Sequence, residues 1–408
     1  MNINQIRSLF PQLQEKVYAH PLVYLDNAAT SLRPKSVIDK WKEMSIKHNS
    51  NIHRAVHKTA VDATEEYESA RIAVAEFIGA LPEETIFTSG TTHSVNMLAA
   101  VLERSSFFSL GDEILIAESE HHSDIVPWQL LARRKGFKIK VLPVNDKGET
   151  DVRTLSLLLT PNTKLCCIAQ ISNVLGIINP IEEIVQACHA NGTLVFVDGA
   201  QGITHVPTDV KSLDCDFYAF SGHKMYAAPG TGVLYGKKHF LQELPPYMGG
   251  GEMIESVSWE KTSFAPVPGR FEAGTQNLSG VPTFKPAIET CKLLRDREIK
   301  EHTKALTTFV YDALSSDPYI RVFGTPDNFE RKIPIFSIVV KGAHHEDLAL
   351  ILDKMGIAVR SGQMCAEPLM DRFGVTGMLR ASFAPYNTAD EARYLLESLR
   401  KAIKMLRG

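Results

Sequence analysis

The sequence predicts an α/β protein with a large domain, built on a mainly parallel seven-stranded sheet, and a smaller C-terminal α+β domain. Three observations indicate this fold. The chain has 408 residues, which is enough for two domains. Short, nearly continuous apolar runs alternate with helix-like patterns, as is typical of a parallel sheet covered on both faces. A stretch rich in Gly and Pro then separates these runs from a second block of helix and strand patterns.

The predicted large domain spans residues 21–286 and follows an N-terminal arm over residues 1–20, which contains a short helix. Apolar spacing predicts a helix over Val61–Gly79, where the glycine ends it. A second helix is predicted over Ile181–Asn191, with Gly192 just beyond it. The predicted strands are Thr85–Thr88, Glu113–Ala117, Lys138–Val144, Leu165–Ile171, Leu194–Val197, Phe217–Phe220 and Gly232–Tyr235.

Residues 249–286 lack periodicity and predict a long connection, a kind of segment that is often functional. Residues 287–408 are expected to form the small domain. Its predicted elements are a long helix over Ala287–Ser315, a strand over Pro334–Val340, and helices over His345–Met355 and Asp390–Leu406. The charged run Arg295–Lys304 is interpreted as the solvated face of the long helix.

Composition and charge exclude several classes of protein. A net charge of −3 gives no electrostatic reason to expect nucleic acid or an anionic membrane as a partner. No apolar run reaches the roughly 20 residues that cross a bilayer, and the first residues lack the pattern of a secretory signal. Six cysteines without Cys-x-x-Cys spacing argue against a disulfide framework or a metal site. We therefore expect a cytoplasmic protein.

Small polar residues follow the predicted strand Thr85–Thr88. Ser89, Gly90, Thr91 and Thr92 precede a helical pattern, and such a helix start can bind a phosphate through its N–H groups and hydroxyls. A helix N-cap without any ligand is the alternative for this segment.

Two ionisable residues follow later strands. Asp198 ends a buried strand and needs a partner, which a pyridinium N–H could provide, although a helix cap also explains it. Lys224 follows Ser221 and His223, and a lysine amine can form an imine with an aldehyde. A solvated lysine is the alternative, but the three segments occupy successive β–α units, whose strand ends meet at one edge of the sheet. The pair His121–His122 and Asn173 also follow predicted strands.

Several segments resemble the class V aminotransferase family of fold-type I pyridoxal-5′-phosphate (PLP) enzymes, specifically the SufS/CsdA type (group II) of cysteine desulfurases and selenocysteine lyases. The similarity extends from Tyr24 to the C-terminus. The segments that carry it are HHSDIVPWQLL, ISNVLG, VDGAQ, LDCDFYAFSGHKMY, GRFEAGTQN, VRSGQMCAEPLM and LRASFAPYNT.

The resemblance implies a PLP site. Lys224 would bind the aldehyde and move the α-proton, Asp198 would pair with the ring nitrogen, and Gln201 would bind the ring hydroxyl. His121 would stack on the ring and is a candidate proton carrier. The residues implied to bind the phosphate are Thr91, Thr92, Ser221, His223 and, from the neighbouring subunit of a homodimer, Thr275.

The resemblance also implies a substrate site and a nucleophile. Asn173 and Arg380 would bind the carboxylate of L-cysteine, with Arg360 as a second cation near the substrate. Cys365 would take the sulfur as a persulfide, leaving L-alanine, and the cationic Arg360 would favour its thiolate. The other cysteines are interpreted as buried apolar residues.

The sequence departs from the family in three places. Gln363 and Met364 stand where relatives commonly have two histidines before the nucleophilic cysteine. His93 replaces a glutamate that many relatives have, and Ala55 replaces a glycine. The first departure affects the chemistry and acceptor docking of the Cys365 loop, and the other two concern the dimer interface or the entrance to the site.

Two alternatives to a cysteine desulfurase remain. One keeps the cofactor and changes the reaction, as in a selenocysteine lyase or another class V lyase or epimerase. The other is a scaffold that binds a partner without PLP. The resemblance further implies a sulfur acceptor of the SufE or SufU kind that serves iron–sulfur cluster assembly.

Overall fold

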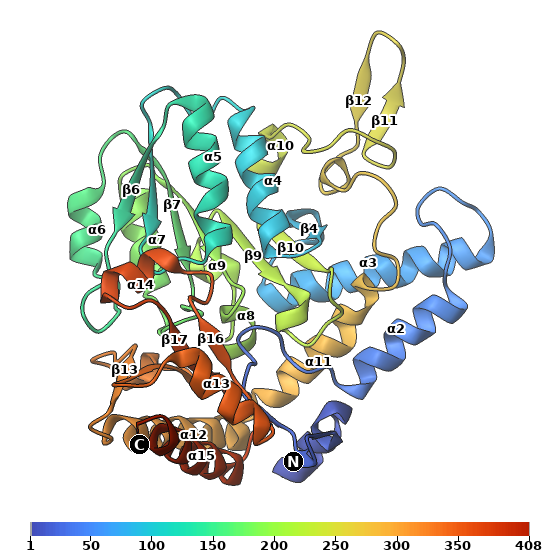
Figure 1. Cartoon of the computed structure of the whole chain (residues 1–408). Helices are drawn as coiled ribbons and strands as arrows, with labels where there is room; N and C mark the ends of the chain where they lie inside the picture. The colour runs from blue at the N-terminus through green and yellow to red at the C-terminus, as the bar shows by residue number, and fades with distance from the viewer. Residues whose placement is uncertain (1, 408) are drawn as a thin grey trace.

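The structure, a computed structural model, describes residues 2–407. Its largest sheet has the strand order β4-β10-β9-β8-β7-β5-β6, and only β10 runs antiparallel to its neighbours. This confirms a mainly parallel sheet of seven strands (Figure 1). The strands are β4 (Thr85–Thr88), β5 (Glu113–Ala117), β6 (Lys138–Leu142), β7 (Thr163–Ala169), β8 (Leu194–Asp198), β9 (Phe217–Ser221) and β10 (Gly232–Gly236).

Helices cover both faces of this sheet, because side chains that alternate along each buried strand need apolar partners on both sides. Val195 and Val197 of β8 pack in one cluster with α3, α7 and α11, whereas Phe196 packs in another with α4 and α5. The helices of this part are α2 (Lys35–Lys47), α3 (Lys58–Ile78), α4 (Thr91–Glu103), α5 (Val126–Lys135), α6 (Val152–Leu158), α7 (Ile181–Ala190), α8 (Gly202–His205), α9 (Val210–Leu213), α10 (Lys238–Glu243) and α11 (Phe284–Leu294).

A second, antiparallel sheet of four strands lies beside the first and has the order β13-β14-β17-β16. Its apolar face packs on α12, α13 and α15. The elements are α12 (Arg297–Ser315), β13 (Ile320–Phe323), β14 (Ile335–Val340), α13 (His345–Lys354), β16 (Arg360–Gly362), α14 (Glu367–Phe373), β17 (Met378–Ser382) and α15 (Ala389–Arg407). This is the small α+β unit that the sequence predicts, while the domain boundaries at 20/21 and 286/287 stay predictions.

The expectation of one long helix over Ala287–Ser315 is wrong. The structure has two helices here, α11 and α12, because Asp296 accepts a hydrogen bond from the backbone N–H of Glu298 and starts a new helix. The helix α11 packs on α2 and α3, whereas α12 packs on α15. The charged run therefore contains a helix boundary as well as a solvated face.

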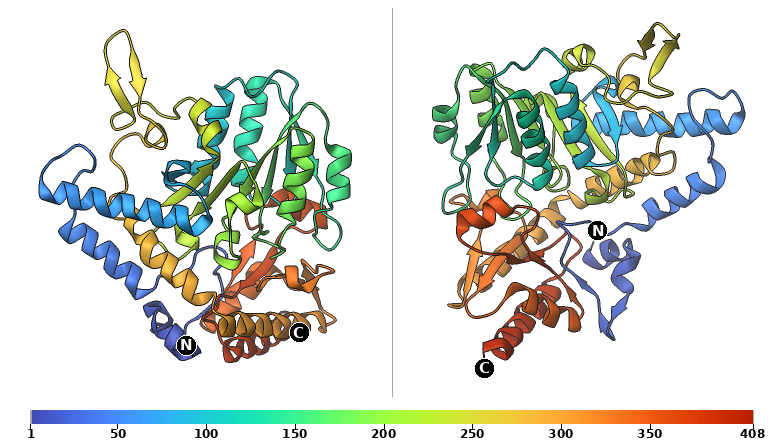
Figure 2. Two further views of the ribbon diagram at one scale, coloured as in Figure 1. Left: turned by 180° about the vertical axis from the view of Figure 1, so that it is seen from behind. Right: turned by 45° about the horizontal axis from the view of Figure 1, so that its top comes forward.

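The connection over residues 249–286 contains a β-hairpin that its sequence did not predict. Strands β11 (Ile254–Val257) and β12 (Thr262–Phe264) pair with each other alone, and both views in Figure 2 show them projecting away from the body. Val257 and Trp259 on this hairpin are largely exposed.

The N-terminal arm joins the two parts of the fold. It contains α1 (Ile3–Ser8) and the start of the short pair β1 (Lys16–Val17) and β2 (His20–Pro21). It leads into β3 (Val23–Tyr24), which pairs with β15 (Ile357–Ala358). Arg7 forms an ion pair with Glu391, and the buried ring of Phe10 packs on Tyr226 and Tyr386. Within residues 2–407, no helix combines the length and apolar character that crossing a membrane requires.

Candidate active site

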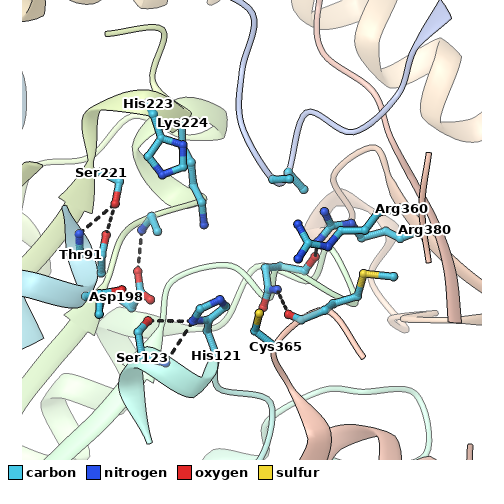
Figure 3. Close-up of a pocket in the computed structure, with 16 residues that line it drawn as sticks. Thr91, His121, Ser123, Asp198, Ser221, His223, Lys224, Arg360, Cys365 and Arg380 are labelled. Carbon is cyan, nitrogen blue, oxygen red and sulfur yellow. Dashed lines mark hydrogen bonds between the residues drawn. The ribbon is translucent and has the colours of Figure 1, made fainter. Parts of the chain in front are cut away.

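A cavity of about 170 Å³ lies between the carboxyl ends of the parallel strands and the four-stranded sheet. Of the residues that the resemblance implies for cofactor, substrate and nucleophile, all but Gln201 and Thr275 line it (Figure 3). The lining residues are Ala28, Ala29, Thr91, Thr92, His121, Ser123, Asn173, Asp198, Ala200, Ser221, His223, Lys224, Arg360, Met364, Cys365 and Arg380.

The start of α4 forms one wall of the cavity. Gly90, with φ near 148°, is the N-cap and has no side chain that could accept from the first-turn amides, so the positive end of the helix faces the cavity. Thr91 donates its backbone N–H to Ser221 Oγ at 2.8 Å, and its hydroxyl lies 2.8 Å from the same atom. A Cβ on Gly232 would lie 2.4 Å from the Cα of Gly90, so β10 must have glycine where it passes this turn. The N-cap is therefore Gly90, and none of the hydroxyls of Ser89, Thr91 and Thr92 caps the helix.

His93, one of the departures from the family, belongs to the same turn. Its Nδ1 accepts a hydrogen bond from the Ser89 backbone N–H at 3.1 Å and lies 3.2 Å from the Ser89 hydroxyl. Burial lowers the pKa of this half-buried imidazole. His93 therefore stabilises the turn that leads into α4.

Asp198 and Lys224 face the cavity from neighbouring strands. Asp198 ends β8, where its Oδ1 accepts the Ala200 N–H at 2.7 Å. Lys224 lies on the turn η4 (Gly222–Lys224) directly after β9. Burial lowers the pKa of Lys224 against the opposing effect of Asp198, so more of its amine is unprotonated near neutral pH. Burial also raises the pKa of Asp198, and Lys224 counters this rise.

His121 projects into the cavity opposite Lys224. Its Nδ1 accepts the backbone N–H of Ser123 at 3.1 Å and lies 2.7 Å from the Ser123 hydroxyl. Burial, together with the charge of Lys224, lowers the pKa of His121 to about 4. The ring is therefore neutral at pH 7 and carries its proton on Nε2, because Nδ1 accepts.

His223 and Gln201 occupy different surroundings. His223 lines the cavity and its pKa is lowered to about 4 by burial and by Lys224. Gln201 does not line the cavity. Its side-chain amide donates to the Ala28 carbonyl at 2.7 Å and so holds Ala28, which lines the cavity, in place. Thr275, the other residue outside the lining, is exposed on the connection after the hairpin.

Two arginines form the opposite wall. Arg360 on β16 and Arg380 on β17 are direct partners in an antiparallel pair, which brings their side chains together. Arg380 is almost fully buried and donates to Asp26 at 2.9 Å and to the Asn173 carbonyl at 2.9 Å. Each terminal nitrogen of Arg380 keeps a second N–H for a ligand. The wall can therefore bind a carboxylate.

Cys365 reaches the cavity from the loop between β16 and α14. Met364 and Cys365 both have positive φ, 54° and 56°, a conformation that non-glycine residues adopt only when their surroundings enforce it. The Cys365 carbonyl accepts the His122 N–H at 2.7 Å, and the Met364 carbonyl accepts the Asn173 amide at 2.9 Å. The Nε2 atom of His122 accepts the Glu367 N–H at 3.0 Å.

The structure shows what Gln363 and Met364 do at the positions where relatives commonly have two histidines. Met364 is buried in an apolar cluster with Val174 and Phe373, so its side chain anchors the loop, while Gln363 is exposed. Cys365 is partly exposed, and the other five cysteines are buried as expected.

Sequence reasoning missed Ser123, Asp26 and the acids Glu120 and Asp124. Ser123 and Asp124 follow His121 within the segment HHSDIVPWQLL, and Asp26 lies two residues after Tyr24, where the similarity to the family begins. The role of Asp26 depends on Arg380, which is 354 residues away in the chain. Only the fold reveals that contact.

Known proteins resemble this chain over its whole length. The family model described as aminotransferase class-V matches residues 23–395. A probable cysteine desulfurase of Vibrio cholerae is 44% identical over 407 residues, covering 100% of each chain. A cysteine desulfurase of Dickeya dadantii is 41% identical and covers 99% of this chain and 97% of the relative.

Solved structures agree with this result. The cysteine desulfurase CsdA of Escherichia coli, in an S-sulfonic acid form, is 38% identical with a TM-score of 0.90, covering 100% of this chain and 99% of the other. The apo cysteine desulfurase of Thermococcus onnurineus is 35% identical with a TM-score of 0.91, covering 97% and 99%.

Proposed function

Because the chain belongs to the aminotransferase class-V family, we propose that it is a PLP-dependent cysteine desulfurase of the SufS/CsdA type. It converts L-cysteine to L-alanine and receives the sulfur on Cys365 as a persulfide. One observation carries the proposal: the amine of Lys224, the carboxylate of Asp198 and the thiol of Cys365 open onto one cavity, next to two arginines.

The residues present fit PLP. The cofactor has an aldehyde, a ring nitrogen and a phosphate, and the cavity offers a lysine amine with a lowered pKa, a buried carboxylate and a helix N-terminus. Lys224 would hold the aldehyde, Asp198 the ring nitrogen and His121 the ring. Gln201, one of whose amide N–H groups secures Ala28 beside the cavity, would use its other N–H for the ring hydroxyl. Thr91, Thr92, Ser221 and His223 would hold the phosphate. When bound, PLP acts as an electron sink that makes the substrate α-proton acidic.

Substrate binding uses the arginine wall. Arg380 and Arg360 hold the carboxylate of L-cysteine, and Asn173, whose side chain already secures the Met364 carbonyl, borders the same place. The amine of Lys224 then takes the α-proton and delivers it to the product carbon. His121 is neutral and can donate or accept a proton at Nε2 on the ring side of the substrate.

Cys365 performs the transfer of sulfur. Its thiolate attacks the sulfur of the substrate, so an S–S bond forms and the C–S bond of the substrate breaks. The electron pair of that bond returns to the carbon framework, which takes up a proton and leaves as L-alanine. The three hydrogen bonds of the loop fix where the thiolate sits, and partial exposure leaves the resulting persulfide accessible to an acceptor.

We extend the proposal to the partners. Thr275 is exposed on the large connecting segment, and the neighbouring hairpin presents Val257 and Trp259 to solvent, as expected for surfaces that pack in a homodimer. In that dimer Thr275 reaches the phosphate of the other subunit. The sulfur acceptor is a protein of the SufE or SufU kind in iron–sulfur cluster assembly, and unpaired cysteines agree with a cytoplasmic location.

The proposal is tested by measuring L-alanine and sulfide together, with L-cysteine and L-selenocysteine as parallel substrates and with or without a sulfur acceptor protein. We expect one alanine for each sulfur transferred from L-cysteine, and faster turnover with the acceptor because it removes the persulfide. Alanine from selenocysteine alone would favour a selenocysteine lyase. Absence of alanine with both substrates would contradict the proposal.

A further inference from the structure

Two acidic side chains lie directly behind His121, and the proposed reaction does not use them. Glu120 precedes His121, and Asp124 ends the turn η3 (His122–Asp124) that follows it. Both side chains are fully buried. Glu120 Oε1 accepts the Ala169 N–H at 2.8 Å, and Asp124 Oδ1 accepts the indole N–H of Trp128 at 2.8 Å.

The second oxygen of each acid has no donor among the described residues. Glu120 Oε2 and Asp124 Oδ2 are both buried and meet no N–H or O–H of the described residues, and each carboxyl group lies close enough to shift the pKa of the other. A hydrogen bond between these two oxygens would require a proton, because an ionised carboxyl can only accept. Two ionised carboxyls held side by side in a buried site would repel each other strongly.

Three ionisable groups on β7 and β8 interact with the pair. Asp198 on β8 raises the pKa of both carboxyls, and Glu120 in turn raises the pKa of the thiols of Cys166 and Cys167 on β7. None of these three groups is cationic. A proton on the pair would lower its charge.

We infer that Glu120 and Asp124 share one proton and that this shared proton positions His121. The role of His121 itself rests on the proposed function. The pair connects two anchors on either side of the histidine: Glu120 joins it to the end of β7 through Ala169, and Asp124 joins it to α5 through Trp128. Asp124 also donates its backbone N–H to the His121 carbonyl at 2.7 Å.

The shared proton makes stability depend on pH in a defined direction. Burial raises the pKa of both carboxyls, and the charge of Asp124 adds to the rise at Glu120 while that of Asp198 adds to the rise at Asp124. The folded protein therefore keeps a proton that the unfolded chain releases above the ordinary carboxyl range. At pH values above the ordinary carboxyl pKa, unfolding therefore releases a proton, and a rise in pH favours the unfolded chain. The unfolding constant should increase by up to about tenfold per pH unit from this pair, until the folded pair also loses its proton.

Asp124→Asn tests the shared proton. The amide oxygen can still accept from Trp128 while the amide N–H donates to Glu120, so the link is kept without the extra proton. In the cofactor-loaded variant we expect the unfolding constant, measured by denaturation at several pH values, to lose the increase of about tenfold per pH unit that the parent shows. The infrared absorption of a buried protonated carboxyl should also be lost. Glu118→Gln is the matched control, because it removes a carboxyl from the segment between β5 and η3, where Glu118 lies 3.6 Å from Arg372. It should keep both signals. The inference would be overturned if the parent and the Asp124→Asn protein had the same dependence of the unfolding constant on pH and the same infrared absorption.

The positioning role is tested by adding Asp124→Ala, which leaves Trp128 and Glu120 without their partner. We expect kcat for alanine formation to fall by about tenfold or more in the alanine variant with little change in KM, and to recover largely in the asparagine variant. Parent-like kcat in both variants, or equal losses in both, would contradict positioning through this link. If the alanine variant does not fold, the unfolding and infrared comparison of Asp124→Asn still decides on the proton. Those two measurements need no substrate, so they stand even if the proposed function fails.

Discussion

Replacing Lys224 with alanine is expected to abolish L-alanine formation from L-cysteine, with a loss of about a thousandfold or more. The amine both binds the cofactor and moves the α-proton in the proposed reaction. No other lysine among the described residues lines the cavity, and the neutral imidazoles of His121 and His223 cannot form the same imine. Alanine is measured by chromatography at saturating L-cysteine.

The control for this prediction is Lys238→Ala. Lys238 is exposed, pairs with Glu83 on the surface and lies outside the cavity, so its loss should leave the rate at the parent value. Alanine formation by the Lys224→Ala protein at more than a few per cent of the parent rate would show that another group moves the α-proton.

The second large effect is expected for Cys365→Ser. The protein should bind PLP as the parent does, because the cofactor residues lie on other elements, but it should form no persulfide and release sulfide at least about a hundredfold more slowly. A hydroxyl at this place is too weakly acidic to supply the nucleophile that the thiolate provides.

Mass spectrometry of the parent after reaction with L-cysteine provides an internal check. The added sulfur should lie on the peptide with Cys365 alone, since the other cysteines are buried. Sulfide release by Cys365→Ser at the parent rate, or added sulfur on another cysteine, would show that the nucleophile is wrongly assigned.

The parallel sheet and its ligand edge could be predicted because their signals are local. Each strand is a short apolar run, and the residues after the strand ends, such as Asp198 and Lys224, meet at one edge by the geometry of a parallel sheet. The boundary between α11 and α12 was missed because one side-chain cap at Asp296 interrupts an otherwise continuous helical pattern.

Other features depend on contacts that a single sequence does not reveal. Arg360 and Arg380 face each other because of the register between β16 and β17. The proton-sharing inference for Glu120 and Asp124 depends on the burial of both side chains and on the two oxygens that meet no donor among residues 2–407. The role of Thr275 stays a prediction, because its expected phosphate partner belongs to a second subunit.

The central claim is an imine between Lys224 and the aldehyde of PLP, and borohydride reduction tests it most directly. The cofactor-loaded protein is reduced, digested and mapped by mass spectrometry. The account predicts the mass of a reduced phosphopyridoxyl group on the peptide with Lys224 and on no other lysine. A protein that binds no cofactor, or a reduced adduct on a different lysine while Lys224 stays unmodified, would contradict it.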